Sequence, residues 1–202
     1  MEKDFRCELI SWRQVYLLAR KLAYTIDGDK FQPDVIVAIA RGGYVPARIL
    51  CDFLDVNTLA SIRIEHYLPG AIKRKAARLT DPLAIDIEGK NVLVVDDVND
   101  TGDTLEVAVH HLKEFSPKDV RVAVLNQKTT SGFRPEYFAR KIIKWRWLIY
   151  PWAVMEDLSG LLAKRGSQFS TVEKMASVFL EKYKCKVPQQ LLEDVFLKMK
   201  KG

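Results

Sequence analysis

Residues 92–105 combine an apolar run with acids, hydroxyls and a glycine, a set that can hold a phosphorylated sugar. The apolar run at 92–95 predicts a buried strand, and Asp96 and Asp97 follow it directly. Residues 100–104 then read DTGDT, and a run that favours a helix comes next. A helix N-terminus offers unpaired N–H groups and a positive dipole end, so the segment predicts a phosphate site.

Individual side chains in this segment have the chemistry that such a site needs. Gly102 lets the backbone approach a phosphate closely, and Thr101 and Thr104 add hydroxyl donors. An ordinary strand–helix turn, capped by Asp100 or Thr101, is the simpler alternative. Capping alone does not call for three acids within residues 96–100, so we favour the phosphate site.

Composition places the chain among globular proteins of one domain, or of one domain with an extension. It has 202 residues, of which 48% are hydrophobic and 29% charged, and it contains no apolar run of the length that spans a membrane. The N-terminal residues predict no secretory signal, and three cysteines without CxxC spacing suit reduced thiols in the cytoplasm. The net charge of +6 suits either nucleic acid or a phosphate-rich substrate.

Hydrophobic patterning predicts alternating strands and helices. The expected elements are a helix from the cap Ser11 to about Ile26, strands at 35–39, 59–64, 92–96 and 120–126, and helices at 44–54 and 104–115. Such a series predicts an α/β fold with a mainly parallel sheet and helices on both faces. Ligands bind such sheets at the carboxyl ends of the strands, which is where Asp96 and Asp97 lie.

Two segments depart from this alternation. Residues 67–90 are broken by proline and glycine and rich in Lys and Arg, so we expect a long mobile loop with a short strand near its end. Residues 158–202 show helical spacing and predict two or three short amphipathic helices, the last starting at Pro188. We therefore expect a domain at 1–157 and a helical extension at 158–202.

A second chemical segment follows the first predicted strand. Residues 40–43 read ARGG, in which the glycines expose backbone N–H groups and Arg41 supplies a permanent cation. Taken alone, a Gly-Gly pair after a strand is explained as well by a simple turn.

Four hydrophobic residues, two acids and a Thr-Gly-x-Thr loop, in this order, resemble the phosphoribosyl pyrophosphate signature of the type I phosphoribosyltransferases. The resemblance covers about residues 10–157. It implies that Asp96 and Asp97 hold the ribose hydroxyls, and that Asp100 is the general base. It also assigns the 5′-phosphate to the loop Thr101, Gly102, Asp103 and Thr104.

The same resemblance implies how pyrophosphate is held. It gives Arg41 and Gly42 to a pyrophosphate loop that often contains a cis peptide bond. It also makes the basic stretch 67–78 a hood that closes over the reaction, with Tyr67 and either Lys73 or Arg74 reaching the substrate. The family often has a Ser-Tyr pair here, where this chain has His66 before the tyrosine.

Residues 124–130, VLNQKTT, and 147–152, WLIYPW, resemble the base-binding parts of the 6-oxopurine enzymes. The resemblance implies that Lys128 donates to the purine O6, that Trp147 stacks on the ring and that the Leu148 backbone reads the base edge. Lysine has donors and no acceptor, which disfavours adenine on physical grounds. Without the resemblance, a surface lysine and a core tryptophan would be the simpler interpretations.

The implied reaction converts phosphoribosyl pyrophosphate and hypoxanthine, guanine or xanthine into a nucleoside 5′-monophosphate and pyrophosphate. Mg²⁺ is expected, held mostly by substrate oxygens and water, with Asp96 and Asp97 contributing indirectly. Ala153 stands where many relatives carry an acid, and the next acids are Glu156 and Asp157. The choice among the three bases and a second magnesium site therefore stay open.

In its long hood and its extra C-terminal helices the chain most resembles the archaeal 6-oxopurine enzymes. A homodimer or higher homo-oligomer is expected, without membrane or nucleic-acid partners. One alternative is a regulator on the same fold that senses phosphoribosyl pyrophosphate or a nucleotide and binds nucleic acid, although the N-terminus shows no helix-turn-helix or zinc signature. A pure interaction protein with a decayed site is the other, and the intact acids at 96, 97 and 100 argue against it.

Overall fold

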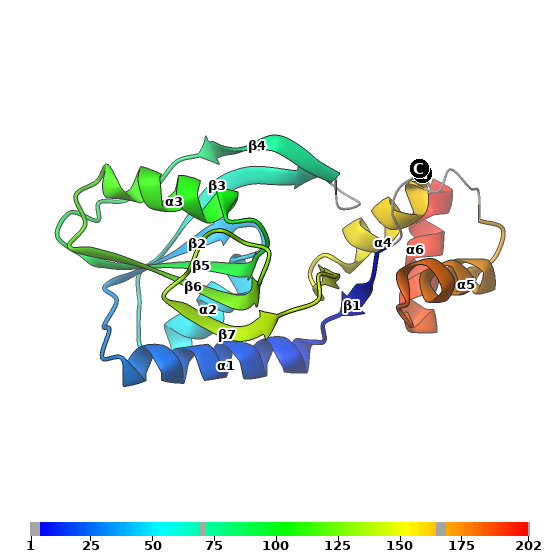
Figure 1. The fold of residues 1–202 in the computed structure, drawn as a ribbon, viewed down its shortest axis with the longest axis horizontal. Coiled ribbons are helices and arrows are strands. Elements are labelled where there is room, and N and C mark those ends of the chain that lie inside the picture. Colours follow the sequence, from blue (N-terminus) through cyan, green and yellow to red (C-terminus); the bar gives the residue numbers. More distant parts are fainter. Residues whose placement is uncertain (1–4, 69–71, 165–168, 202) are drawn as a thin grey trace. The chain divides into compact units, whose positions relative to one another are not determined.

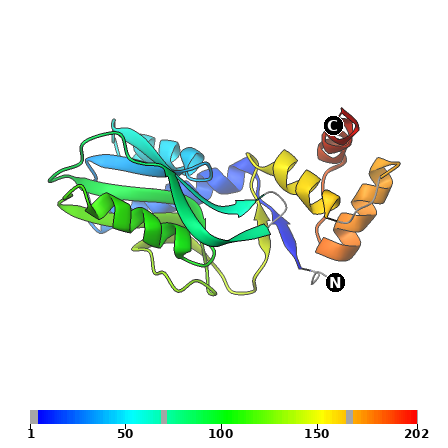
Figure 2. The ribbon, with the colours of Figure 1, turned by 90° about the horizontal axis from the view of Figure 1, so that it is seen from above.

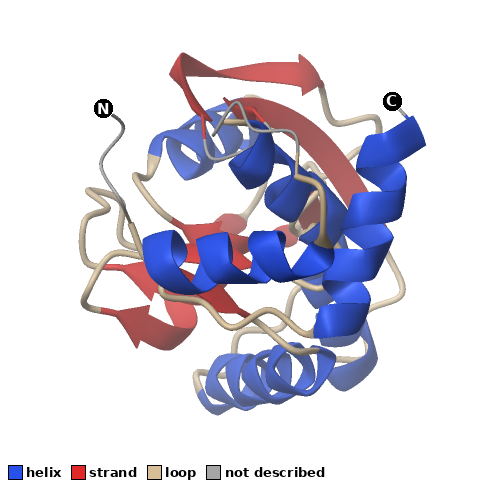
Figure 3. Cartoon of the chain, turned by 90° about the vertical axis from the view of Figure 1, so that its right-hand side faces the viewer, coloured by secondary structure: helices blue, strands red, loops and turns tan. Residues whose placement is uncertain are grey.

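A computed structural model describes the chain except for residues 1–4, 69–71, 165–168 and 202, and the side chains of residues 66–76 and 201. It is a mixed α/β structure of helices and strands (Figure 3). The elements are β1 (Cys7–Leu9), α1 (Trp12–Gly28), β2 (Val35–Ala40), α2 (Tyr44–Phe53), β3 (Leu59–Leu68), β4 (Ile72–Asp81), β5 (Asn91–Asn99), α3 (Asp103–Lys113), β6 (Asp119–Lys128), β7 (Tyr137–Ile142), β8 (Trp147–Ile149), α4 (Val154–Ala163), α5 (Val172–Tyr183) and α6 (Gln189–Lys201).

The main sheet has six strands in the order β4-β3-β2-β5-β6-β7. β2 pairs in parallel with β3 and β5, and β6 pairs in parallel with β5 and β7. The central strands are nearly continuous apolar runs because both of their faces are covered by helices. The predicted α/β fold with a mainly parallel sheet is therefore confirmed.

Helices pack on the two faces of this sheet, α3 on one and α1 and α2 on the other (Figure 1). On the α3 face, Val37, Val94 and Val124 from three strands pack with Leu105 and Ala108 of the helix. On the opposite side, α1 buries one stripe at helical spacing, namely Val15, Ala19, Leu22, Ala23 and Ile26. The covered faces leave the ends of the strands for a site.

The prediction of a long loop at 67–90 was wrong for much of that segment. β3 continues to Leu68, and residues 72–81 form β4 beside it at the edge of the sheet (Figure 2). Lys and Arg are common on edge strands, where charge discourages pairing with other chains, so a basic segment can still be a strand. β7 was also missed by the sequence prediction.

Residues 1–12, 67–73 and 145–202 form a compact unit separate from residues 13–66 and 74–144. In this smaller unit β1 and β8 pair in parallel, with Leu9 opposite Ile149. The helices α4, α5 and α6 enclose an apolar core that contains Phe179, which has no exposed surface. The predicted amphipathic helices are present as three helices, and α6 begins directly after Pro188.

All three cysteines are free and buried, in line with the expected reduced thiols. Burial raises the pKa of the Cys7, Cys51 and Cys185 thiols, which makes them poor nucleophiles. Within the described parts of the chain, no helix has the length and apolar character needed to cross a membrane.

Gly43 joins β2 to α2 at a point where no side chain fits. A Cβ at this position would lie 2.3 Å from the carbonyl oxygen of Val95 and 2.8 Å from the amide nitrogen of Ile39, both backbone atoms of central strands. We expect Gly43→Ala to lower the free energy of unfolding by about 1–3 kcal/mol, because the strands must shift to admit the methyl group. Urea unfolding followed by circular dichroism measures this loss.

Gly28→Ala is the matched control, since a Cβ there meets nothing within 4 Å. The packing argument fails if Gly43→Ala and Gly28→Ala unfold at the same urea concentration.

Candidate functional site

In the larger unit, the parallel sheet brings the predicted site residues together at the carboxyl ends of its strands. β2, β5 and β6 are neighbours running in the same direction, so their carboxyl ends lie side by side. Gly42 follows β2, Asp96 and Asp97 lie in the last part of β5, and Lys128 ends β6. This is the edge at which ligands bind such sheets.

Gly42 and Asp97 are in close contact across two strand ends. A Cβ at Gly42 would lie 2.5 Å from Oδ2 of Asp97, so any other residue would push this carboxylate away. Glycine therefore allows the backbone after β2 to lie directly against the acid. The peptide bond between Ala40 and Arg41 is cis, as the resemblance implied, and the Arg41 side chain is exposed.

Asp96 is the buried member of the acid pair. Its side chain is 8% exposed, and its Oδ1 accepts a hydrogen bond of 2.9 Å from the backbone N–H of Asp97. Burial and the neighbouring Asp97 carboxylate raise the pKa of Asp96 well above its usual range. An acid that is buried at this energetic cost indicates a role other than stability.

The middle residue of the DTGDT loop, Gly102, has a backbone conformation that favours glycine. Gly102 caps α3 with a φ of +105°, and its carbonyl accepts the first helical hydrogen bond from Glu106. A Cβ on Gly102 would lie 2.7 Å from Cβ of Phe133. The cap of α3 is therefore Gly102 itself, not Asp100 or Thr101 as the simple-turn alternative required. The first turn of α3 leaves backbone N–H groups for an anion.

Lys128 and Asp100 form a buried ion pair. Nζ of Lys128 lies 3.1 Å from Oδ2 of Asp100, and the two side chains are only 2% and 10% exposed. Burial lowers the pKa of Lys128, and the Asp100 carboxylate opposes part of this effect, with a smaller contribution from Asp97. The sequence singled out both residues, but it did not predict that they meet.

Two buried amides at this edge were missed by the sequence analysis. Nδ2 of Asn99 donates to Oε1 of Gln127 over 2.8 Å, and both side chains are buried. The sequence carried little signal for them, because the predicted strands ended at residues 96 and 126 and both amides lie beyond those ends. In the structure β5 and β6 run on to Asn99 and Lys128, which buries the two amides and makes a partner necessary.

Trp147 and Leu148 belong to the smaller compact unit. Leu148 is 5% exposed and pairs with Glu8 in the β1–β8 ladder. Trp147 is partly buried and packs against the core of the α4–α6 helices. Nearby, the rings of Tyr150 and Trp152 stack with centroids 4.8 Å apart.

The predicted hood side chains, Tyr67, Lys73 and Arg74, lie outside the described side chains. Their roles stay predictions, as do those of Trp147 and Leu148.

The donor set at the acid pair fits a magnesium ion that is held mainly by substrate. Among the described residues, no group of three or more His, Cys, Asp or Glu side chains could hold a metal by itself. Mg²⁺ in phosphate-binding sites uses one or two carboxylates together with substrate phosphates and water. Asp96 and Asp97, adjacent at a strand end, supply that number of carboxylates.

Comparisons with known proteins agree with this geometry. The xanthine-guanine phosphoribosyltransferase of Ruegeria sp. (strain TM1040) is 34% identical over 160 residues, covering 75% of this chain and 86% of that protein. The crystal structure of a purine phosphoribosyltransferase from Pyrococcus horikoshii has a TM-score of 0.62 and 32% identity, covering 72% of this chain and 93% of that one. A hypothetical protein from Neisseria gonorrhoeae with bound ppGpp has a TM-score of 0.65 and 27% identity, covering 81% of this chain and 98% of that one.

The family model of the phosphoribosyl transferase domain matches residues 8–155, which include the acid pair, the DTGDT loop and the Lys128–Asp100 pair. With most of its length matched and the expected fold observed, the chain belongs to the phosphoribosyl transferase family.

Proposed function

We propose that the protein transfers the 5-phosphoribosyl group of phosphoribosyl pyrophosphate to a 6-oxopurine base, as in purine salvage. The observation that carries this proposal is the buried Lys128–Asp100 pair at the carboxyl edge of the sheet. A lysine can donate to a 6-oxo group but cannot accept from a 6-amino group. The names of the relatives support the same substrate class, because xanthine and guanine are both 6-oxopurines.

In the proposed reaction the bond from the sugar C1′ to pyrophosphate breaks and a bond from C1′ to the purine N9 forms. The base loses a proton, and in this proposal Asp100 accepts it. Lys128, paired with the same carboxylate, donates to the purine O6. The buried position of this pair favours the proposal, since charges act more strongly on a reacting group away from water.

The other assignments follow the arrangement at the strand ends. Asp96 and Asp97 bind the ribose hydroxyls, and the loop at 101–104 with the N-terminus of α3 binds the 5′-phosphate. Arg41 and Gly42 bind pyrophosphate through a cation and exposed backbone. The contact of Gly42 with Asp97 supports this division, because it sets the pyrophosphate loop beside the ribose acids.

Magnesium would be held by phosphate and ribose oxygens and water, with Asp96 and Asp97 orienting that shell. When bound it supplies neutralisation of the charge on the departing pyrophosphate.

The family match ends at residue 155, which supports a catalytic domain at 1–157 and a helical extension at 158–202. The homo-oligomer and the cytoplasmic location stay predictions.

The proposed function is tested by a turnover assay with phosphoribosyl pyrophosphate and magnesium, in which hypoxanthine, guanine, xanthine, adenine and uracil are offered singly. We expect nucleotide formation with at least one 6-oxopurine and none with adenine, because Lys128 has no acceptor. Turnover with adenine would contradict the base assignment. Binding of phosphoribosyl pyrophosphate without turnover of any base would favour the regulator, and salt-dependent retention on nucleic acid would then test that alternative.

Asp100→Ala is expected to lower kcat by about 10²–10⁴-fold, because it removes the proton acceptor. Binding of phosphoribosyl pyrophosphate, measured by calorimetry, should change far less. Asp52→Asn, at an exposed acid of α2, controls for the lost charge. Equal losses in turnover and binding would contradict the general-base role.

Asp96→Asn is expected to stabilise the free protein at neutral pH while lowering its activity. Because the folded-state pKa is raised, ionised Asp96 destabilises the fold, and this effect is absent at pH values below an ordinary aspartate pKa of about 4. The effect grows as pH rises toward the folded-state pKa and is complete above it. Asparagine retains an oxygen that can accept the Asp97 N–H.

Urea midpoints of wild type and Asp96→Asn, measured from pH 3.5 to 8, check this expectation. The two proteins should converge at the acid end and diverge above it, and Asp52→Asn should show no such divergence. A wild type that is more stable than Asp96→Asn at neutral pH would contradict the argument.

A further inference from the structure

We propose that Asn99 and Gln127 are positioning residues, which hold Lys128 and Asp100 in the geometry that reads and deprotonates the base. We call their two side-chain amides, together with residues 130–133 of the loop after β6, the amide clamp. This inference rests on the proposed function and adds to it two residues that act through Lys128 and Asp100.

The clamp begins with a side-chain bond between neighbouring strands. Asn99 and Gln127 are register partners at the ends of β5 and β6, and Nδ2 of Asn99 donates to Oε1 of Gln127 over 2.8 Å. The same Nδ2 donates to the carbonyl of Phe133 over 3.0 Å, and Ser131 Oγ donates to Oδ1 of Asn99 over 2.8 Å. The Asn99 amide therefore ties two strands to the following loop.

The second half of the clamp fixes the backbone of Lys128. Nε2 of Gln127 donates to the Lys128 carbonyl over 3.1 Å, and the backbone N–H of Ser131 donates to the same oxygen over 3.2 Å. Two donors from different directions hold this carbonyl, and the Lys128 side chain starts from the same residue. The position of this backbone therefore sets the point from which the side chain extends to Asp100.

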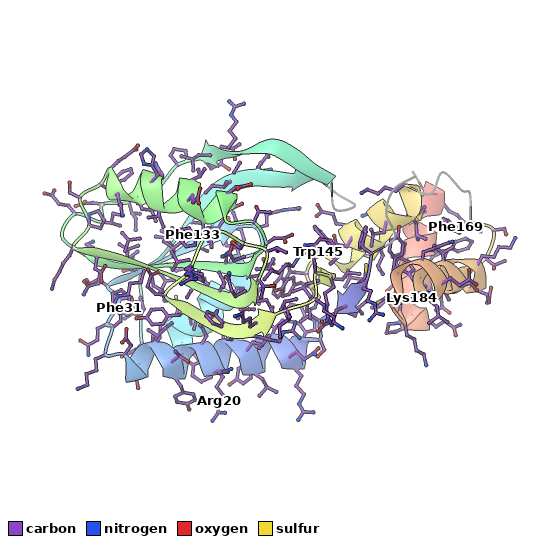
Figure 4. All side chains as sticks on the ribbon, in the orientation of Figure 1. Arg20, Phe31, Phe133, Trp145, Phe169 and Lys184 are labelled. Atoms are coloured by element: carbon purple, nitrogen blue, oxygen red, sulfur yellow. The ribbon has the colours of Figure 1, made fainter. Side chains whose placement is uncertain are left out.

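The loop also holds the other partner of the ion pair. Thr130 Oγ1 donates to the carbonyl of Asp100 over 3.1 Å, and the N–H of Gly132 donates to the carbonyl of Thr101 over 3.2 Å. Phe133, labelled in Figure 4, packs so closely on Gly102 that a Cβ there would not fit. One short loop thus fixes Lys128, Asp100 and the start of the phosphate loop together.

The burial of Asn99 and Gln127 helps to distinguish a positioning role from a contribution to stability alone. Asn99 is 1% exposed and Gln127 is 8% exposed, so each amide must be satisfied to avoid a desolvation penalty. Two apolar side chains of similar shape could replace the bond between the two amides at little cost in stability. They would leave the carbonyls of Lys128 and Phe133 with fewer donors. The contribution specific to the amides is therefore to orient Lys128 and Asp100, because group transfer requires reacting groups in a fixed geometry.

The test compares Asn99→Leu, Gln127→Met and the double variant with wild type. Each single change removes the Asn99–Gln127 bond together with the bonds that the replaced amide makes to the loop, so both single variants should lose stability. The double variant should stay folded and lose less than the sum of the two single losses, because the Asn99–Gln127 bond counts in both, and a double-mutant cycle of urea unfolding measures this difference. Thr129→Ala is the matched control, because Thr129 lies next to the clamp but its hydroxyl donates to Ile143.

Although it stays folded, the double variant should lose at least about tenfold in kcat with a 6-oxopurine, as expected for misplaced reacting groups. KM for phosphoribosyl pyrophosphate should stay within about threefold, because the acid pair and the phosphate loop are retained. Thr129→Ala should keep wild-type values.

A wild-type kcat in the folded double variant would overturn the proposal, since the amides would then be structural only. A wild type without turnover would instead overturn the proposed function. In that case a crystal structure of the double variant decides on the clamp. A Lys128 Nζ to Asp100 Oδ2 distance still near 3.1 Å refutes positioning, and a separated pair supports it.

Discussion

The buried ion pair between Lys128 and Asp100 is the interaction on which the candidate site depends. Removing either member of such a pair leaves an uncompensated buried charge, at a cost of about 3–5 kcal/mol, so the two residues must be placed together. β5 and β6 meet this requirement as parallel neighbours whose carboxyl ends lie at the same edge. The loop after β6 then turns back and bonds to the carbonyls of Asp100 and Thr101. The sheet supplies the proximity, and the loop supplies the orientation.

The carboxyl ends of β2 and β5 combine a buried acid with closely packed backbone, an arrangement that suits ligand binding better than the stability of the free protein. Asp96 is buried beside Asp97, and its raised pKa shows that the free protein accommodates its charge poorly. Glycines at 42 and 43 remove side chains where the backbone lies against Asp97 and Val95. A bound sugar with hydroxyl donors would satisfy these acids, whereas water reaches Asp96 only slightly. The unfavourable burial is therefore coherent with a site completed by its substrate.

The basic composition of residues 72–81 is compatible both with an exposed loop and with an edge strand. Residues 72–81 are rich in Lys and Arg, yet they form the edge strand β4 beside β3. An edge strand pairs on one side only, and charged residues are common there because they discourage pairing with other chains. The basic composition that predicted a loop is thus equally suited to this position in the sheet.

The order of residues was enough to predict the strand–loop–helix signature at 92–105, the parallel α/β class and the helices of the C-terminal part, because these depend on residues close together in the chain. It also pointed to Asp100 and Lys128 separately. Their pairing, the bond between Asn99 and Gln127 and the place of residues 72–81 in the sheet became visible in the folded chain alone. These contacts join distant segments through strand order and register, and no single segment encodes the register of its partner.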